Sequence, residues 1–344
     1  MRRSGPALLA LLGLAGSGVG WWQAPGLFYH GWLAAVVAFA GWPLGSLALL
    51  FVHSLSGGRW GVAIRPALLG AVATMPLLLP AAVPLVIGLG RLYPWLAVPA
   101  AGLSNGFYLD ASFFAGRVAV YLVIWLVLAG LVWRCGARDP ALRRLAVPGL
   151  ILLALTVTFA AIDLTEALDW HFNSSIWGML TAASFALDAL AVAILVSLAL
   201  AQPAEPVRAD LARLLLGLVI LWAYLEFMQA LIVWESDLPN DTGWYLPRIG
   251  GVWGVVAYGV ALGHFAVPFC LLLSRRMQGS RRVLATAGGL VVASGILRWW
   301  WVVLPAGPGG LRWVDGAAVL GLAGCGMLLF RAALPETGCE VAHG

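Results

Sequence analysis

The chain carries carboxylate, imidazole and amide side chains within stretches that are otherwise apolar. Glu226 and Gln229 lie in LWAYLEFMQALIVW, and Asp188 lies in SFALDALAVAIL. A carboxyl group in a low-dielectric surrounding keeps its proton more readily than in water, so it can exchange that proton with a neighbour. A set of such groups at staggered depths is what a proton route needs. The predicted proton-route residues are Asp163, Glu166, Asp169, His171, Asp188, Glu226, Gln229, His264 and His53.

Simpler interpretations of these residues stay open from the sequence alone. A buried carboxylate can pair with an arginine at the same depth, and Arg117 and Arg298 also lie within apolar stretches. His264 can bond a neighbouring backbone or hydroxyl group, and His53 can have a structural role at the end of its stretch. The acids nearest a membrane surface can be solvated there.

A run of three tryptophans, Trp299 to Trp301, precedes Pro305. Flat aromatic rings can line a pocket for a quinone headgroup, or they can anchor a helix end at the membrane interface, where tryptophan is enriched. The predicted quinone contacts are Trp299, Trp300, Arg298 and Arg248. No residue is predicted to be catalytic.

Composition indicates where these side chains lie. Of the 344 residues, 62% are hydrophobic and only 10% are charged, and the mean hydropathy is +0.94. Soluble domains carry about 25% charged residues. The long continuous apolar runs predict an all-α polytopic membrane protein, since a membrane β-barrel has short alternating segments. Ten spans are predicted at 6–22, 31–54, 64–89, 111–133, 146–168, 174–200, 211–235, 249–274, 283–304 and 313–331.

The distribution of arginine predicts the orientation. With ten spans and a cytoplasmic N-terminus, 15 of the 20 arginines fall on the cytoplasmic side and three on the other, with Arg117 and Arg298 inside spans. Such a bias fits the positive-inside rule, so both termini are predicted to be cytoplasmic. The first 20 residues also resemble a signal peptide, but we favour an uncleaved span. Residues 1–331 are predicted to form one membrane domain, followed by a short cytoplasmic tail at 332–344.

Several classes of function are not supported by the residues. The net charge of +5 comes from short arginine-bearing loops, with no lysine, so no nucleic-acid partner is expected. The four cysteines show no CxxC spacing, so no zinc site or disulfide framework is predicted. The three histidines in or near spans, His53, His171 and His264, lie at different depths, so a haem with two histidine ligands is not expected. We predict no cofactor bound covalently or through metal ligands.

A family resemblance adds to this interpretation. The ordered set of matching segments resembles the ActF family of integral membrane subunits of alternative complex III, which are relatives of the NrfD and polysulfide-reductase membrane subunits. The matching segments are LLFVHSLSGGRWG (49–61), LYPWL (92–96), YLDASFFAGRVAVYLVIW (108–125), ALDWHFNSSIWGM (167–179), EFMQALIVWESDLPNDTGWYLPR (226–248), HFAVPFCLLLSRR (264–276) and WVVLP (301–305).

The resemblance implies a subunit of a quinol-oxidising complex in a bacterial inner membrane. It implies two four-helix bundles plus two extra helices, and a proton route without a redox cofactor in this chain. The expected partners are an NrfD-like sister subunit and extracytoplasmic iron–sulfur and c-haem subunits, and the expected ligand is a quinone or menaquinone. Two other functions stay open: a stand-alone proton-coupled transporter, and a non-catalytic scaffold of a respiratory complex.

Overall fold

The protein is a bundle of long helices, as predicted. The computed structural model describes residues 4–99, 102–103, 105–135 and 139–341, and the described residues contain no strand. Among these residues, ten helices are long and apolar enough to cross a membrane. They are α1 (Ser4–Gln23), α2 (Pro25–Ser56), α3 (Arg59–Val72) with α4 (Leu78–Ile87), α6 (Ala111–Cys135), α7 (Asp139–Leu164), α8 (Trp177–Leu200), α9 (Glu205–Ser236), α11 (Gly251–Val260) with α12 (Val267–Leu273), α14 (Arg281–Val303) and α15 (Trp313–Val341).

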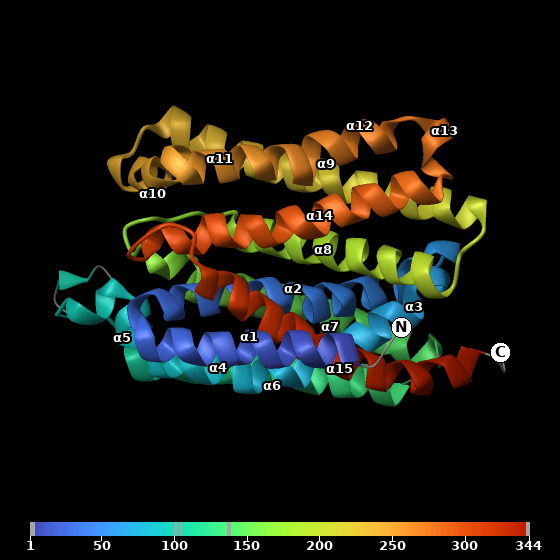
Figure 1. Cartoon of the computed structure of the whole chain (residues 1–344), viewed down its shortest axis with the longest axis horizontal. Helices are drawn as coiled ribbons and strands as arrows, with labels where there is room; N and C mark the ends of the chain where they lie inside the picture. The colour runs from blue at the N-terminus through green and yellow to red at the C-terminus, as the bar shows by residue number, and fades with distance from the viewer. Residues whose placement is uncertain (1–3, 100–101, 104, 136–138, 342–344) are drawn as a thin grey trace.

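The contacts between helices define two four-helix bundles. The first bundle contains α2, α3 with α4, α6 and α7, and the second contains α8, α9, α11 with α12, and α14. The bundles meet mainly where α8 packs against α2 and α7, and where α14 packs against α2. Figure 1 shows the second bundle as the upper part of the molecule and the first bundle beneath it. The two remaining helices, α1 and α15, pack against each other and cover α2.

Two of the spans are interrupted, and proline accounts for both positions. In the third span, α3 gives way to a 3-10 turn, η1 (Met75–Leu77), before α4 begins. Pro76 lies in this turn, and Pro80 and Pro84 follow it. In the eighth span, a π-helical segment, η5 (Ala261–Ala266), lies between α11 and α12. Pro268 follows it and has no N–H to bond the carbonyl of His264, so the regular helical ladder cannot continue there.

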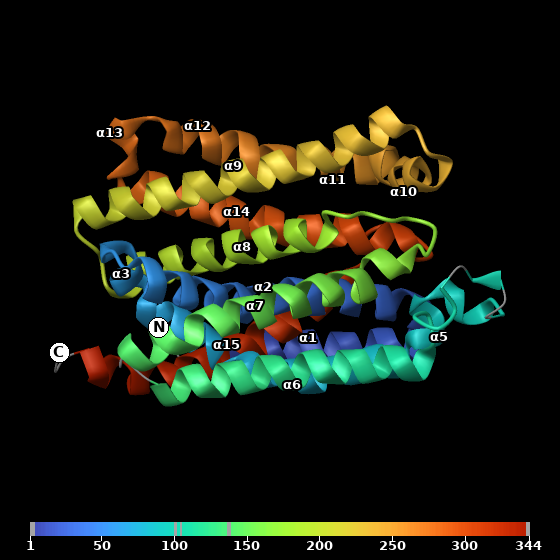
Figure 2. The same ribbon diagram turned by 180° about the vertical axis from the view of Figure 1, so that it is seen from behind.

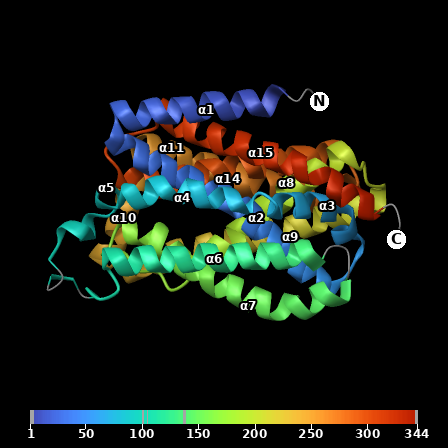
Figure 3. The ribbon, with the colours of Figure 1, turned by 90° about the horizontal axis from the view of Figure 1, so that it is seen from below.

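The packing of α1 against α15 depends on residues without large side chains. A Cβ atom added to Gly13 would collide with the backbone of Gly321, and one added to Gly324 would collide with the backbone of Ala10. Lipid provides no hydrophobic driving force between helices, so close backbone approach is a main source of their association. Figure 3 shows α1 and α15 side by side along one edge, with α6 and α7 along the other.

The two ends of the bundle differ in charge. The arginine-rich end contains the connections at 57–58, 201–204 and 274–280, including α13 (Arg275–Gln278), and both termini lie toward it (Figures 1 and 2). The acidic end contains the connections at 88–110, 165–176, 237–250 and 304–312. These include α5 (Leu89–Leu92), η2 (Pro94–Ala97), η4 (Glu166–Leu168), α10 (Pro239–Ile249) and η6 (Leu304–Ala306). The helix α15 continues past residue 331 to Val341, and the division into a membrane domain and a cytoplasmic tail stays a prediction.

We expect Gly13→Leu to separate α1 from α15 and lower the thermal unfolding midpoint of the detergent-solubilised chain. Overpacking of a close contact costs about 1–3 kcal/mol. Gly18→Leu is the matched control on the same helix, because no atom lies within 4 Å of a Cβ added there. Equal midpoints for the two variants would show that the close contact does not hold α1 in place.

The arginine distribution further predicts that the acidic end faces away from the cytoplasm. In a background without the native cysteines, Asn240→Cys should react with a membrane-impermeant maleimide in intact cells, and Ala204→Cys should react only after permeabilisation. Both positions are exposed in connections at opposite ends. The reverse labelling pattern would invert the orientation.

Candidate functional site

Asp188 and His264 face each other inside the second bundle. Asp188 lies on α8, and His264 lies in the π-helical segment η5, with its ring edge-on to Trp222. The distance between His264 Nε2 and Asp188 Oδ1 is 3.9 Å, which is too long for a direct hydrogen bond. Both atoms are buried, and neither has a hydrogen-bond partner among the described residues. Such a pair is a candidate for proton exchange, and π-helical segments are frequent at functional sites.

The other side of the imidazole fixes which nitrogen carries the proton. His264 Nδ1 lies 3.0 Å from Ser294 Oγ and 3.2 Å from the carbonyl oxygen of Val291. The Ser294 hydroxyl donates its own hydrogen to the Leu290 carbonyl oxygen at 2.6 Å. The hydrogen between Ser294 and the ring therefore belongs to Nδ1. This assignment from the hydrogen-bond network leaves the lone pair of Nε2 facing Asp188.

Arg298 connects this pair to a second acid. It lies one turn after Ser294 on α14, and its Nε donates to Glu226 Oε1 on α9 at 2.7 Å. The Arg298 side chain is 2% exposed and the Glu226 side chain is 21% exposed. The guanidinium charge also acts on Asp188 and His264, and its Nη1 is buried without a hydrogen-bond partner. One cation is thus shared between Glu226 and the Asp188–His264 pair.

From Glu226, polar side chains continue to the acidic end. Gln229 follows Glu226 by one turn of α9 and accepts a hydrogen bond from the Ser174 hydroxyl. The Ser174 backbone N–H donates to Glu166 Oε1 at 3.1 Å. The charge of Asp241, on α10, acts on Glu166 in turn. We call the series from the Asp188–His264 pair through Arg298 to Glu166 the polar series.

Tyr245 places α10 over the outer part of the polar series. Its hydroxyl is hydrogen-bonded to Gln229, and burial raises the pKa of this hydroxyl, with the Glu226 charge adding to the shift. Tyr245 therefore stays a neutral hydroxyl, which can both donate and accept a hydrogen bond. It can serve as a further link between Gln229 and the acidic end.

Arg248 fixes α10 to the end of α14. Its guanidinium carbon lies 3.6 Å from the centre of the Trp244 ring, and Nη2 donates to the Val302 carbonyl oxygen at 2.8 Å. Burial lowers the pKa of Arg248 to about 9, against the opposing effect of the Asp169 charge. The group remains a cation at neutral pH. Its contacts anchor the helix above the polar series.

Asp163 lies outside the polar series and is fully paired. On α7 of the first bundle, it accepts hydrogen bonds from Arg117 Nε and Nη2, each at 2.9 Å, and from the Tyr121 hydroxyl at 2.8 Å. Arg117 Nη1 donates to the Tyr108 carbonyl oxygen. Both oxygens of Asp163 and all three nitrogens of Arg117 are occupied. This pair matches the simpler interpretation of a buried acid that neutralises an arginine.

Three other predicted residues lie away from the polar series. Asp169 and His171 are neighbours at the acidic end, with Oδ1 and Nδ1 3.4 Å apart, and His171 is 51% exposed. His53 lies at the arginine-rich end, where Nε2 is 3.0 Å from the Gly58 carbonyl oxygen and the ring packs against Trp60. The structure places His53 at the turn between α2 and α3.

A mainly apolar cavity lies between the two bundles. It has a volume of about 520 Å³ and is bounded by α2, α8, α14 and α15. Its wall is apolar apart from Asp188 and Arg331. We call it the lipophilic groove. Of the four predicted quinone contacts, Trp299 lines the groove, whereas Trp300, Arg298 and Arg248 do not.

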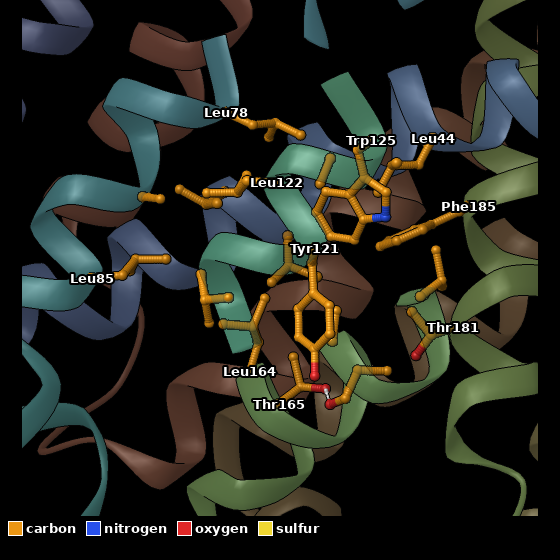
Figure 4. Close-up of a pocket in the computed structure, with 18 residues that line it drawn as sticks. Leu44, Leu78, Leu85, Tyr121, Leu122, Trp125, Leu164, Thr165, Thr181 and Phe185 are labelled. Atoms are coloured by element: carbon orange, nitrogen blue, oxygen red, sulfur yellow. Dashed lines mark hydrogen bonds between the residues drawn. The ribbon is translucent and has the colours of Figure 1, made fainter. Parts of the chain in front are cut away.

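A smaller cavity of about 50 Å³ lies inside the first bundle and against α8. Figure 4 shows Tyr121, Trp125 and Phe185 around it, with the Tyr121 hydroxyl pointing toward Thr165. Phe185 also packs against Trp299, with ring centres 5.6 Å apart, so it separates this cavity from the lipophilic groove. Its apolar wall suits packing better than chemistry.

Sequence reasoning missed the two serines that link the polar series. The signal for Ser294 was its spacing, since SGILR places it four residues before Arg298 on one helix face. Ser174 gives no signal, because it lies in the irregular connection before α8 and contacts Gln229 on α9, which is distant in sequence. Asp315 was also missed as a buried acid; it accepts the Arg312 backbone N–H at 2.7 Å and packs against Gly31.

Comparisons with known proteins add no family to these observations. Neither a scan against protein-family models nor a search of curated proteins gave a match to this chain. In the part of the chain that the structure describes, no group of three or more His, Cys, Asp or Glu side chains could hold a metal ion.

The Asp163–Arg117 pair provides a stability prediction. Arg117→Gln leaves an unpaired buried acid, so we expect a loss of about 3–5 kcal/mol in the free energy of unfolding in mixed micelles. Adding Asp163→Asn should recover part of this loss. The control is Arg59→Gln, because Arg59 is 66% exposed beside Asp210 and such pairs contribute below about 1 kcal/mol. Equal effects of the two arginine substitutions would contradict the structural role of Asp163.

Proposed function

We propose that this chain is a membrane subunit of a quinol-oxidising complex, and that its polar series carries protons toward the acidic end. The proposed partners are an NrfD-like sister subunit and extracytoplasmic iron–sulfur and c-haem subunits, which would take the electrons. The proposed location is a bacterial inner membrane. The segments that resemble ActF support the choice of complex, and the polar series supports the proton route.

The observation that carries the proton route is the Asp188–His264 pair, with its unpartnered Oδ1 and Nε2 atoms. A proton on Asp188 faces the Nε2 lone pair of His264, and the Arg298 charge stabilises the carboxylate that a proton leaves behind. Glu226 is the next acid, because the same guanidinium holds it. From there Gln229, Ser174 and Tyr245 lead to the acidic end.

The alternatives use the same residues differently. A stand-alone proton-coupled transporter would move protons without partner subunits, and a scaffold would need none of the buried acids. Purification in a mild detergent separates these cases, since co-purifying c-haem and iron–sulfur proteins support the complex and an active single chain supports transport.

The decisive experiment compares three neutral substitutions in the assembled complex. We expect Asp188→Asn and Glu226→Gln to lower quinol oxidation and the accompanying proton release about 10-fold or more, because each removes a proton-accepting group from the series. Asp210→Asn is the matched control, since Asp210 pairs with Arg59 and Arg213 at the arginine-rich end. Subunit composition is measured in parallel to show that each complex assembles.

Full activity in both Asp188→Asn and Glu226→Gln would remove the proton route and leave a scaffold. Proton movement by the purified chain alone in vesicles would favour the transporter.

A further inference from the structure

The lipophilic groove has one polar group at its closed end. Asp188 lines the groove there, beside Gly295, and 15% of its side chain remains exposed. Along α8 the lining continues to Leu200, twelve residues further, which spans roughly 18 Å at 1.5 Å per residue. Leu200 and Met327 line the open end and are exposed on the outside of the bundle. The groove therefore opens toward the membrane in the arginine-rich half.

The closed end sets a requirement on any occupant. Water hydrogen-bonds poorly in a site that offers it a single polar partner. An acyl chain would surround the Asp188 carboxyl group with hydrocarbon. Burial without a hydrogen-bond partner costs free energy for the neutral acid and more for the carboxylate. The occupant should therefore present a hydrogen-bonding group to Asp188 and an apolar body to the rest of the wall, which is apolar except for Arg331 of α15.

Aromatic side chains narrow the choice further. Trp299 lies one turn of α14 from Gly295, so its ring adjoins the closed end. Phe39 and Trp42 of α2 line the groove further along. A flat aromatic ring stacks favourably on such faces. The volume of about 520 Å³ lies within the range of about 300–1,000 Å³ for ligand pockets.

We propose that the lipophilic groove binds an isoprenoid quinol head-first, with one hydroxyl donating to Asp188, the ring against Trp299, and the tail running toward Leu200. The choice of a quinol rests on the proposed function, whereas the hydroxyl-bearing aromatic head and the apolar tail follow from the wall. Asp188 then belongs to two features, because it ends the groove and begins the polar series.

The test measures binding to the purified full chain in detergent, with decylubiquinol as the probe. The matched probe is the dimethyl ether of decylubiquinol, which keeps the ring and the tail but carries methoxy groups in place of both hydroxyl donors. We expect the ether to bind the native chain at least about 10-fold more weakly, because it cannot donate to Asp188. Asp188→Leu should weaken decylubiquinol binding to the level of the ether.

Two variants locate the site. Ala323→Phe fills the groove from α15 and should abolish binding of both probes, whereas Leu320→Phe on the same helix lies outside the lining and should leave it unchanged.

Equal affinity of the native chain for the two probes would overturn the proposal and indicate a groove for lipid chains. This comparison uses only the native chain, so it does not depend on whether a variant folds. Normal binding in Ala323→Phe would overturn it as well, because the site would lie elsewhere. The binding measurement does not depend on turnover, so the groove proposal can hold even if the proton route fails. If decylubiquinol did not bind but Glu226→Gln still lowered turnover, the groove site would be overturned and the proton route would stand.

Discussion

The structure depends on the cost of placing an arginine among apolar helices. The guanidinium of Arg298 is almost fully buried, and it lies where charge must be neutralised by nearby acids. Glu226 of α9 supplies a hydrogen-bonded carboxylate, and the Arg298 charge also acts on Asp188 of α8. One cation on α14 thus pairs with an acid of α9 and acts on a second acid of α8. Packing elsewhere, including the glycine contacts of α1 with α15, contributes stability without any buried charge that must be neutralised.

The two bundles satisfy the same constraint to different degrees. In the first bundle, Arg117 and Asp163 use all of their polar atoms on each other and on two tyrosines. A saturated pair of this kind has no capacity for exchange. In the second bundle, Arg298 Nη1, Asp188 Oδ1 and His264 Nε2 are buried without hydrogen-bond partners. Partly satisfied polar groups are costly, so their presence favours a functional role for the second bundle over the first.

Much of the fold, but less of the site, could be predicted from the sequence. The spans followed from the length of the apolar runs, and each predicted span overlaps a membrane-spanning helix. Depth along a helix also follows from residue number, which brought Glu226 and Gln229 into the prediction. The neighbouring helix that a side chain faces cannot be predicted so simply, because several helices are apolar on all sides. The saturated state of Asp163 and the link through Ser174 depend on contacts between residues that are distant in sequence. The position of His53 depends on its local contact with the Gly58 carbonyl oxygen.

The π-helical segment shows how a local irregularity gives the site its asymmetry. It carries His264, whose Nδ1 is engaged by Ser294 and Val291 of α14, so the opposite nitrogen faces α8. Asp188 has His264 on one side and the lipophilic groove on the other. The groove opens in the arginine-rich half, whereas the polar series leads to the acidic end. Any molecule that hydrogen-bonds Asp188 from the groove therefore changes the free energy of the proton that His264 can receive. This coupling needs no moving part, because both events act on the same carboxyl group.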